Sequence, residues 1–261
     1  MTSNTESQLS ATQRSGSRWL WFHKLSSPPY AFATAGRLRP WFLGFSLALM
    51  AVGLWGGLVM APPDYQQKDA FRIIYVHVPS AILSLQVYVI MAVAAAIGLI
   101  WRIKLAHALA AAVAPLGAAF TFLCLVTGSI YGKPMWGTWW EWEPRLTSEL
   151  VLLFLYLGYM ALRSSFDDRQ RADRASAVLA IVGVVNVPIV KFSVEWWTSL
   201  HQGPTFSKLG APSMAASMAW PWAVMMVAFV LYFAAVACDR LRTEILRRER
   251  NAKWLNEALE S

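Results

Sequence analysis

The stretch Ala81–Trp101, AILSLQVYVIMAVAAAIGLIW, contains no charged residue. A run of about 20 apolar residues is long enough to cross the hydrocarbon core of a membrane as an α-helix. In lipid, a helix satisfies its own backbone hydrogen bonds, whereas an open strand leaves them unpaired. This stretch therefore predicts a membrane-spanning helix.

Five more apolar blocks accompany it, and the whole chain is 57% hydrophobic and only 15% charged. Soluble domains carry about 25% charged residues. The further blocks are Trp41–Met60, Ala108–Tyr131, Leu146–Leu162, Ser176–Val190 and Ala215–Cys238. Ser176–Val190 is the weakest because it is short and contains Asn186 and Pro188, which neighbouring helices must accommodate. We predict an all-α membrane protein with six transmembrane helices.

Basic residues are distributed unevenly over the connections between these blocks. Most of the 23 Lys and Arg residues lie in the two termini and in the second and fourth connections. The remaining ones are Lys68, Arg72, Lys133, Arg145, Lys191 and Lys208. The positive-inside rule then places both termini in the cytoplasm. This topology, with attraction to anionic lipid, accounts for the net charge of +8 without invoking nucleic acid.

The predicted topology divides the chain into three parts and puts three segments outside. The parts are a cytoplasmic tail (1–40), a six-helix membrane domain (41–238) and a basic cytoplasmic tail (239–261). The external, periplasmic segments are Ala61–Ser80, Gly132–Arg145 and Lys191–Met214. Cys124 and Cys238 fall at different depths, so we expect packing residues and not a disulfide. The sequence contains no Walker motif or other Gly-rich phosphate loop, so any energy source must be a partner.

Tryptophan is concentrated on the external side. Eight of the 14 tryptophans lie on or beside the external segments: Trp136, Trp139, Trp140, Trp142, Trp196, Trp197, Trp220 and Trp222. An aromatic belt of the usual kind would distribute them over both membrane interfaces. The excess therefore indicates a function on the external face.

The densest tryptophan run admits two conformations. In a helix, Trp136, Trp139, Trp140 and Glu143 would share one face, whereas in an extended chain Trp140 and Trp142 would share one. Both give a flat aromatic platform beside the Glu143 carboxylate and the Arg145 guanidinium. Such a surface suits a large planar ligand with a polar edge.

Two of the four histidines, His77 and His201, fall in external segments that flank this run. Pro79 suits the first turn of the second helix, which places His77 just before that helix. An external helix would put Val194, Trp197 and His201 on one face. Two facing imidazoles could bind a haem iron axially, with the propionates taken by cations among Lys133, Arg145, Lys191 and Lys208. A zinc site is less natural, because zinc usually takes three or four protein ligands.

The run Trp136–Leu150, WGTWWEWEPRLTSEL, closely resembles the tryptophan-rich WWD signature of the haem-handling protein superfamily, W-G-x-W-W-x-W-D-x-R-L-T. The WWD segment of this chain is residues 132–147. Size, six spans and one histidine in each flanking external segment are similar to the CcmC branch. Here Glu143 replaces the signature aspartate, and the following Pro144 restricts it to extended or turn geometry.

The resemblance implies a specific function at the bacterial inner membrane. A CcmC-like protein binds b-type haem transiently at the periplasmic face, with His77 and His201 as axial ligands. The tryptophans Trp136, Trp139, Trp140 and Trp142, with Glu143 and Arg145, would line the porphyrin. Haem would pass to the periplasmic chaperone CcmE during cytochrome c maturation, beside the ABC transporter subunits CcmA and CcmB and the small subunit CcmD. On this account the protein is a delivery subunit and not an enzyme.

Three other functions are compatible with parts of the sequence. A haem lyase would attach haem directly to apocytochrome c, but superfamily members that do so have more spans and more histidines. A haem permease would need polar residues along the membrane interior. The candidates Gln86, Thr121, Thr127 and Asn186 are better explained as helix contacts. A membrane scaffold with an aromatic belt accounts for the spans but not for the tryptophan motif.

Overall fold

We analysed a computed structural model of the chain, which describes residues 27–197, 201 and 214–255. Within these ranges the chain is helical and forms no β-strand, only an isolated bridge between Asp64 and Lys68. Six helical segments are long and apolar enough to cross a membrane: Pro28–Met60, Asp69–Trp101, Lys104–Trp136, Pro144–Ser164, Arg169–Trp196 and Ala216–Glu249. The prediction of six spanning helices is confirmed. The orientation in the membrane and the division into a membrane domain and two tails stay predictions.

The helix boundaries follow from local chemistry. Helix α2 (Pro28–Trp55) begins with two prolines and continues into a π-helical turn, η1 (Gly56–Met60). A 3-10 turn, η2 (Asp69–Ile73), leads into α3 (Ile74–Trp101). Helix α4 (Lys104–Trp136) stops where Gly137 adopts a left-handed conformation, with φ of 81°.

The second half of the chain begins with α5 (Pro144–Ser164), whose first residue is a proline. The Asp168 carboxylate accepts a hydrogen bond from the backbone N–H of Arg171 and so caps α6 (Arg169–Gly183). Helix α7 (Asn186–Trp196) follows a short break, and α8 (Ala216–Glu249) closes the bundle. The weak fifth block is thus two helices, and Asn186 donates a hydrogen bond to the Ser148 carbonyl of α5 at 2.9 Å.

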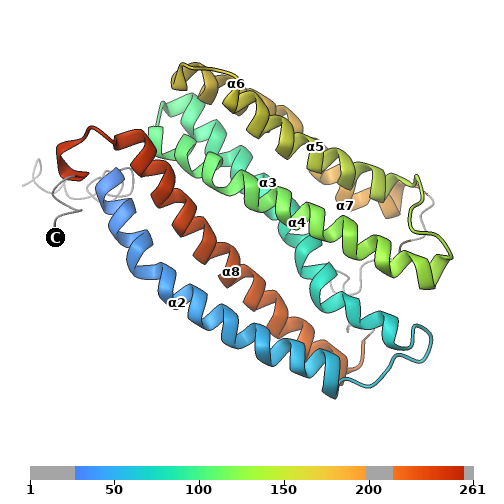
Figure 1. Cartoon of the computed structure of the whole chain (residues 1–261). Coiled ribbons are helices and arrows are strands. Elements are labelled where there is room, and N and C mark those ends of the chain that lie inside the picture. Colours follow the sequence, from blue (N-terminus) through green and yellow to red (C-terminus); the bar gives the residue numbers. More distant parts are fainter. Residues whose placement is uncertain (1–26, 198–200, 202–213, 256–261) are drawn as a thin grey trace, which may run out of the picture.

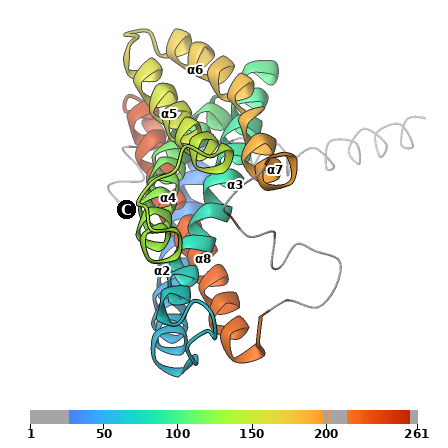
Figure 2. The same ribbon diagram turned by 90° about the vertical axis from the view of Figure 1, so that its right-hand side faces the viewer.

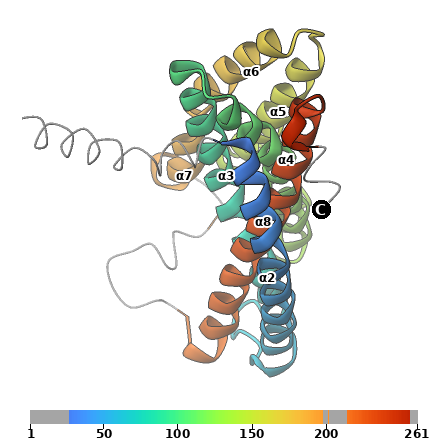
Figure 3. The same cartoon turned by 90° about the vertical axis from the view of Figure 1, so that its left-hand side faces the viewer.

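Helices α3 and α4 form the centre of the bundle (Figure 1). Helix α3 packs against α4, α6 and α8, and α4 also contacts α5 and α8. Helix α2 lies antiparallel along α8, and the ion pair between Arg39 and Asp239 at 2.9 Å joins them near one end. Figure 2 looks toward the end where α4 stops and α5 starts, here called the tryptophan end. Figure 3 looks toward the opposite, basic end, where α2 starts and α8 stops.

The sequence-based boundaries of the second helix were wrong in one respect. Helix α3 starts at Ile74, so His77 and Pro79 both lie within it. The reason is η2, which orders the backbone before the apolar block begins. His77 is therefore held by a helix and not by an external loop.

Close helix packing at the centre depends on tyrosines seated over glycines. Tyr156, fully buried, donates a hydrogen bond to the Ser84 carbonyl at 2.8 Å. A Cβ atom at Gly117 would lie only 2.1 Å from the Tyr156 ring. Small residues of this kind let membrane helices approach closely.

A Gly117→Ala substitution is expected to lower stability, because the ring of Tyr156 and its bond to Ser84 would have to move. Overpacking of this kind costs about 1–3 kcal/mol. We expect the thermal midpoint of the detergent-purified protein to fall by several degrees. Gly44→Ala is the matched control, since no atom lies within 4 Å of its added Cβ. Equal midpoints for the two variants would contradict this packing.

Candidate functional site

His77 lies at the tryptophan end of α3, and its ring is fixed by Thr127 of α4. The Nδ1 atom is 3.0 Å from the Thr127 hydroxyl oxygen. That hydroxyl already donates its hydrogen to the Leu123 carbonyl at 2.6 Å. It can therefore only accept from His77, which puts the hydrogen of a neutral ring on Nδ1 and leaves the lone pair on Nε2. The expectation that Thr127 makes a helix–helix contact is confirmed, and the partner of that contact is the His77 imidazole.

His201 is oriented by a carboxylate. Its Nδ1 atom forms an ion pair with the Glu143 side chain, which is buried. Burial lowers the pKa of His201, and the neighbouring Glu143 carboxylate acts in the opposite direction and raises it. With Nδ1 directed at Glu143, Nε2 is the nitrogen that a metal would reach, as in the carboxylate–histidine pairs of metal sites.

Arg145 provides a positive charge near both histidines. Its positive charge acts on both His77 and His201, which also influence each other electrostatically. Within the described residues its guanidinium makes no ion pair. The two imidazoles predicted from sequence therefore share one site with a cation available to an anionic ligand.

The tryptophan run changes conformation at Gly137. Trp136 is the last residue of α4, and its ring lies 5.0 Å from that of His201 and 5.7 Å from that of Tyr131. Beyond Gly137 the chain is not helical, and the Trp140 and Trp142 rings meet at 5.4 Å. The extended alternative is confirmed for this pair, and the continuous helix is wrong.

Exposure differs sharply among these side chains. Trp139 and Trp142 are 58% and 76% exposed. Trp140 is partly buried, and its indole N–H is buried without a hydrogen-bond partner among the described residues. A buried, unpaired donor is costly and is a common feature of ligand sites. Trp136 and Trp140 are thus partly buried, whereas Trp139 and Trp142 are largely exposed.

Other predicted members are not brought to this site. Trp220 packs over Gly56, where an added Cβ would lie 2.2 Å from its indole, so it belongs to the contact between η1 and α8. Trp196 contacts Phe192 and Trp197. Helix α7 ends at Trp196 and Trp197 is extended, so the predicted helix carrying Trp197 and His201 is wrong.

The other candidate cations also differ from Arg145. Lys133 donates to the Gly137 carbonyl at 3.1 Å and closes the end of α4. Lys191 is exposed on α7. Lys208 lies outside the described residues. Of the three described cations, Arg145 is the one whose charge acts on both histidines.

Sequence analysis missed the buried carboxylate of Glu149, one turn beyond Arg145 on α5. The residue is 5% exposed, and its side chain faces Ser84 of α3 and Cys124 of α4. Arg145 lies near it. A carboxylate inside a membrane segment is itself a signal of function, and the sequence TSEL within an apolar block would have revealed it.

The donor set suits a planar metal complex better than a bare metal ion. Among the described residues, no three His, Cys, Asp or Glu side chains converge as a metal cluster. Two imidazoles can fill the two axial positions of a metal whose other ligands come from a macrocycle. Tryptophan rings suit the faces of such a macrocycle. The Arg145 guanidinium and the Trp140 indole N–H suit its polar edge.

Comparison with known proteins agrees with this geometry. The family model described as Heme exporter protein C (CcmC) matches residues 21–256. The chain belongs to the CcmC family. It is 48% identical to the Heme exporter protein C of Haemophilus influenzae over 237 residues, covering 91% of this chain and 96% of that protein.

Further CcmC relatives are similar over the same region. The Heme exporter protein C of Escherichia coli K12 is 48% identical over 242 residues, covering 92% of this chain and 97% of that protein. The protein of that name from Bradyrhizobium diazoefficiens is 47% identical over 224 residues, with 86% and 85% covered. The family match therefore includes α2 to α8 and the whole tryptophan end.

The pair between Glu143 and His201 gives a prediction that is independent of any ligand. Glu143→Ala removes the acceptor of a buried imidazole, at a cost of about 1–3 kcal/mol. We expect its thermal midpoint in detergent to fall by several degrees. Glu141→Ala, at an exposed carboxylate two residues away, is the control and should have little effect. An equal decrease of the thermal midpoint in both variants would contradict a stabilising ion pair between Glu143 and His201.

Proposed function

We propose that the protein binds haem at the periplasmic face of the bacterial inner membrane and delivers it to the chaperone CcmE during cytochrome c maturation. The observation that carries the proposal is the pair of histidines whose Nδ1 atoms are held by Thr127 and Glu143. Their Nε2 atoms are then the ones presented to a metal. Membership in a family described as Heme exporter protein C supports haem as the ligand.

Each residue of the site has a separate role in this proposal. His77 and His201 are the axial ligands, one on a rigid helix and one held by Glu143. Trp136 packs beside the His201 ring and limits its rotation. When bound, haem would supply the porphyrin that is attached to the next protein, and Trp139 and Trp142 would remain exposed beside the residues that hold it.

The polar edge of the porphyrin carries two carboxylates that need partners. Arg145 offers a planar guanidinium that can bind a carboxylate through two parallel hydrogen bonds. The buried Trp140 indole N–H offers a further donor. Glu149 lies close to Arg145, one turn further along α5.

Delivery requires contacts with other proteins. Trp139 and Trp142 are both exposed and lie in the segment that also carries Glu143, and exposed tryptophans are frequent anchors of protein interfaces. We assign this surface to CcmE. CcmA, CcmB and CcmD are the further partners expected from the resemblance, and the polar tips of α2 and α8 or the lipid-facing helices are available to them.

The two axial ligands give the first prediction about haem. The protein purified from haem-replete cells should show the optical spectrum of six-coordinate, low-spin haem. His77→Ala and His201→Ala should each abolish this spectrum or convert it to a five-coordinate form, because one axial bond is lost. Optical spectra of the purified variants measure this.

His107→Ala is the matched control, since His107 is also buried but lies at the basic end of α4. It should retain the parental spectrum. Haem-free parental protein, even with its partner proteins co-expressed, would overturn the proposal. An unchanged spectrum in the His201 variant would overturn the ligand assignment.

The residue that orients His77 gives a second prediction. Thr127→Val keeps the side-chain shape but removes the acceptor of His77 Nδ1. Removing such a partner lowers metal affinity about 10–100-fold, and we expect a haem dissociation constant raised by about tenfold. Titration of haem into the purified protein measures it.

Thr121→Val is the control for this change. Thr121 is also buried on α4 and donates to a helix carbonyl, of Gly117, but it does not contact a histidine. The two variants should therefore differ in haem affinity and agree in stability. A Thr127 variant with parental affinity would remove Thr127 from the site.

The lyase alternative makes a different prediction from delivery. If the protein alone produced holocytochrome from haem and apocytochrome c in a reconstituted system, the lyase function would replace the one proposed here. We expect no product in that system and covalent haem on CcmE when the chaperone is supplied.

The permease alternative gains little support, because Thr121 and Asn186 are engaged in helix contacts.

A further inference from the structure

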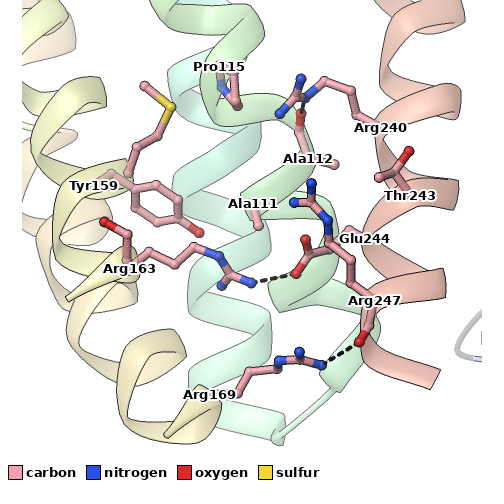
Figure 4. A pocket seen from close by; sticks show the side chains of 12 residues that line it. Ala111, Ala112, Pro115, Tyr159, Arg163, Arg169, Arg240, Thr243, Glu244 and Arg247 are labelled. Atoms are coloured by element: carbon pink, nitrogen blue, oxygen red, sulfur yellow. Dashed lines mark hydrogen bonds and ion pairs between the residues drawn. The ribbon is translucent and has the colours of Figure 1, made fainter. Parts of the chain in front are cut away.

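A cavity of about 400 Å³ lies at the basic end, between α5 and α8. Both helices pack on α4, which forms the floor of the cavity, and they pack little against each other. Figure 4 shows arginine side chains of α5, α6 and α8 reaching into this space. The volume is within the range of small-molecule sites, about 300–1,000 Å³.

An ion-pair network borders this cavity without adding net charge, and two of its members, Arg163 and Glu244, line the cavity. Arg163 pairs with Asp173 and with Glu244. Arg248 binds Asp173 through two hydrogen bonds of 2.9 Å and Glu244 at 3.0 Å. Two arginines and two carboxylates therefore balance each other.

Three further arginines line the cavity and are not balanced: Arg169, Arg240 and Arg247. None of them forms an ion pair within the described residues. Arg169 donates one hydrogen bond to the Arg247 carbonyl, and Arg240 donates one to the Ala112 carbonyl, each at 3.1 Å. A guanidinium has five N–H donors, so most of this donor capacity is available to an anion.

The lining also contains apolar side chains, those of Ala111, Ala112, Pro115 and Met160. Arg240 lies beside them, since it donates to the Ala112 carbonyl (Figure 4). A ligand that fills the cavity therefore meets both guanidinium groups and apolar side chains.

We propose that this cavity binds the headgroup of an anionic phospholipid from the leaflet at the basic end. Arginine binds phosphate through paired hydrogen bonds, and basic pockets between membrane helices are suited to such headgroups. The first acyl carbons lie against Met160 and Pro115. A zwitterionic headgroup is disfavoured, since its own cation would face three arginines. A second cavity shares Arg169 and Arg247, adds Arg248 and Arg250, and includes the carboxylates of Asp167 and Glu249, so arginines outnumber carboxylates there too.

Native mass spectrometry of the detergent-purified full chain tests this proposal. The probes are palmitoyl-oleoyl phosphatidylglycerol and palmitoyl-oleoyl phosphatidylcholine, which differ only in the headgroup. We expect saturable binding of the phosphatidylglycerol and weak binding of the phosphatidylcholine. Arg247→Gln should weaken phosphatidylglycerol binding about fivefold, and Arg240→Gln with Arg247→Gln should weaken it by more than about tenfold.

The matched control is Arg37→Gln with Arg102→Gln, which removes two exposed arginines at the same end but outside the cavity. It should bind phosphatidylglycerol as the parent does. Arg247 donates no side-chain hydrogen bond among the described residues, so its single variant tests the site even if the double variant folds poorly. Equal binding of the two lipids, or equal loss in the control, would overturn the proposal.

These experiments would also reveal two other occupants of the cavity, and either one would contradict the proposal that a lipid binds there. Inorganic phosphate that removes the bound phosphatidylglycerol at millimolar concentration would indicate a site for free phosphate. A variant that keeps its lipid but loses co-purification with other subunits would indicate a protein interface. In either case haem binding at the tryptophan end should be unaffected, because the two sites lie at opposite ends of the bundle.

Discussion

The hydrogen bonds to the Nδ1 atoms of His77 and His201 are the interactions on which the tryptophan end depends. An imidazole has two nitrogens, and only a fixed partner on one of them decides which is presented to a ligand. Thr127 does this on α4 with a hydroxyl whose hydrogen is already used by Leu123. Glu143 does it with a carboxylate just before α5. The backbone elements around the site are arranged so that both partners reach their rings.

The backbone of the WWD segment explains how Glu143 reaches His201. Gly137 ends α4 in a left-handed conformation, and Pro144 begins α5. Between them, Glu143 is extended, with φ of −94° and ψ of 161°, as its position before a proline requires. This turns the side chain inward beneath Trp136 and His201. The glutamate that replaces the signature aspartate is one methylene longer, and it still makes the ion pair with the imidazole.

The two ends of the bundle handle charge in different ways. At the tryptophan end, Glu143 is paired with His201, while Arg145 makes no ion pair within the described residues. At the basic end, Arg163, Arg248, Asp173 and Glu244 neutralise one another, and the arginines around the cavity exceed the carboxylates. The arginines that line the cavity without an ion pair, Arg169, Arg240 and Arg247, are exposed, so most of their hydrogen-bond donors are accessible to a ligand. The unbalanced cations are therefore the groups at which to look for anionic ligands: carboxylates at one end and phosphates at the other.

Much of this could be predicted from the sequence, because apolar length, loop charge and the WWD run are local signals. They gave the six spans, the two histidines and the surface of tryptophans. Three features could not be predicted. The start of α3 at Ile74 depends on the preceding 3-10 turn, and the role of Thr127 depends on the register between α3 and α4. The cavity arginines come from helices that are distant in sequence, Arg169 on α6 and Arg247 on α8, and they meet only because both helices pack on α3.

Pulsed electron paramagnetic resonance tests the central claim most directly. Ferric, haem-loaded protein would be prepared with histidine carrying nitrogen-15 at Nε2 alone, and the hyperfine coupling of the labelled nitrogens to the iron would be measured. The account predicts two strongly coupled labelled nitrogens, one each from His77 and His201, with the coupling of one lost in each alanine variant. Iron coupled to no labelled nitrogen, or to a single one that survives both variants, would contradict it.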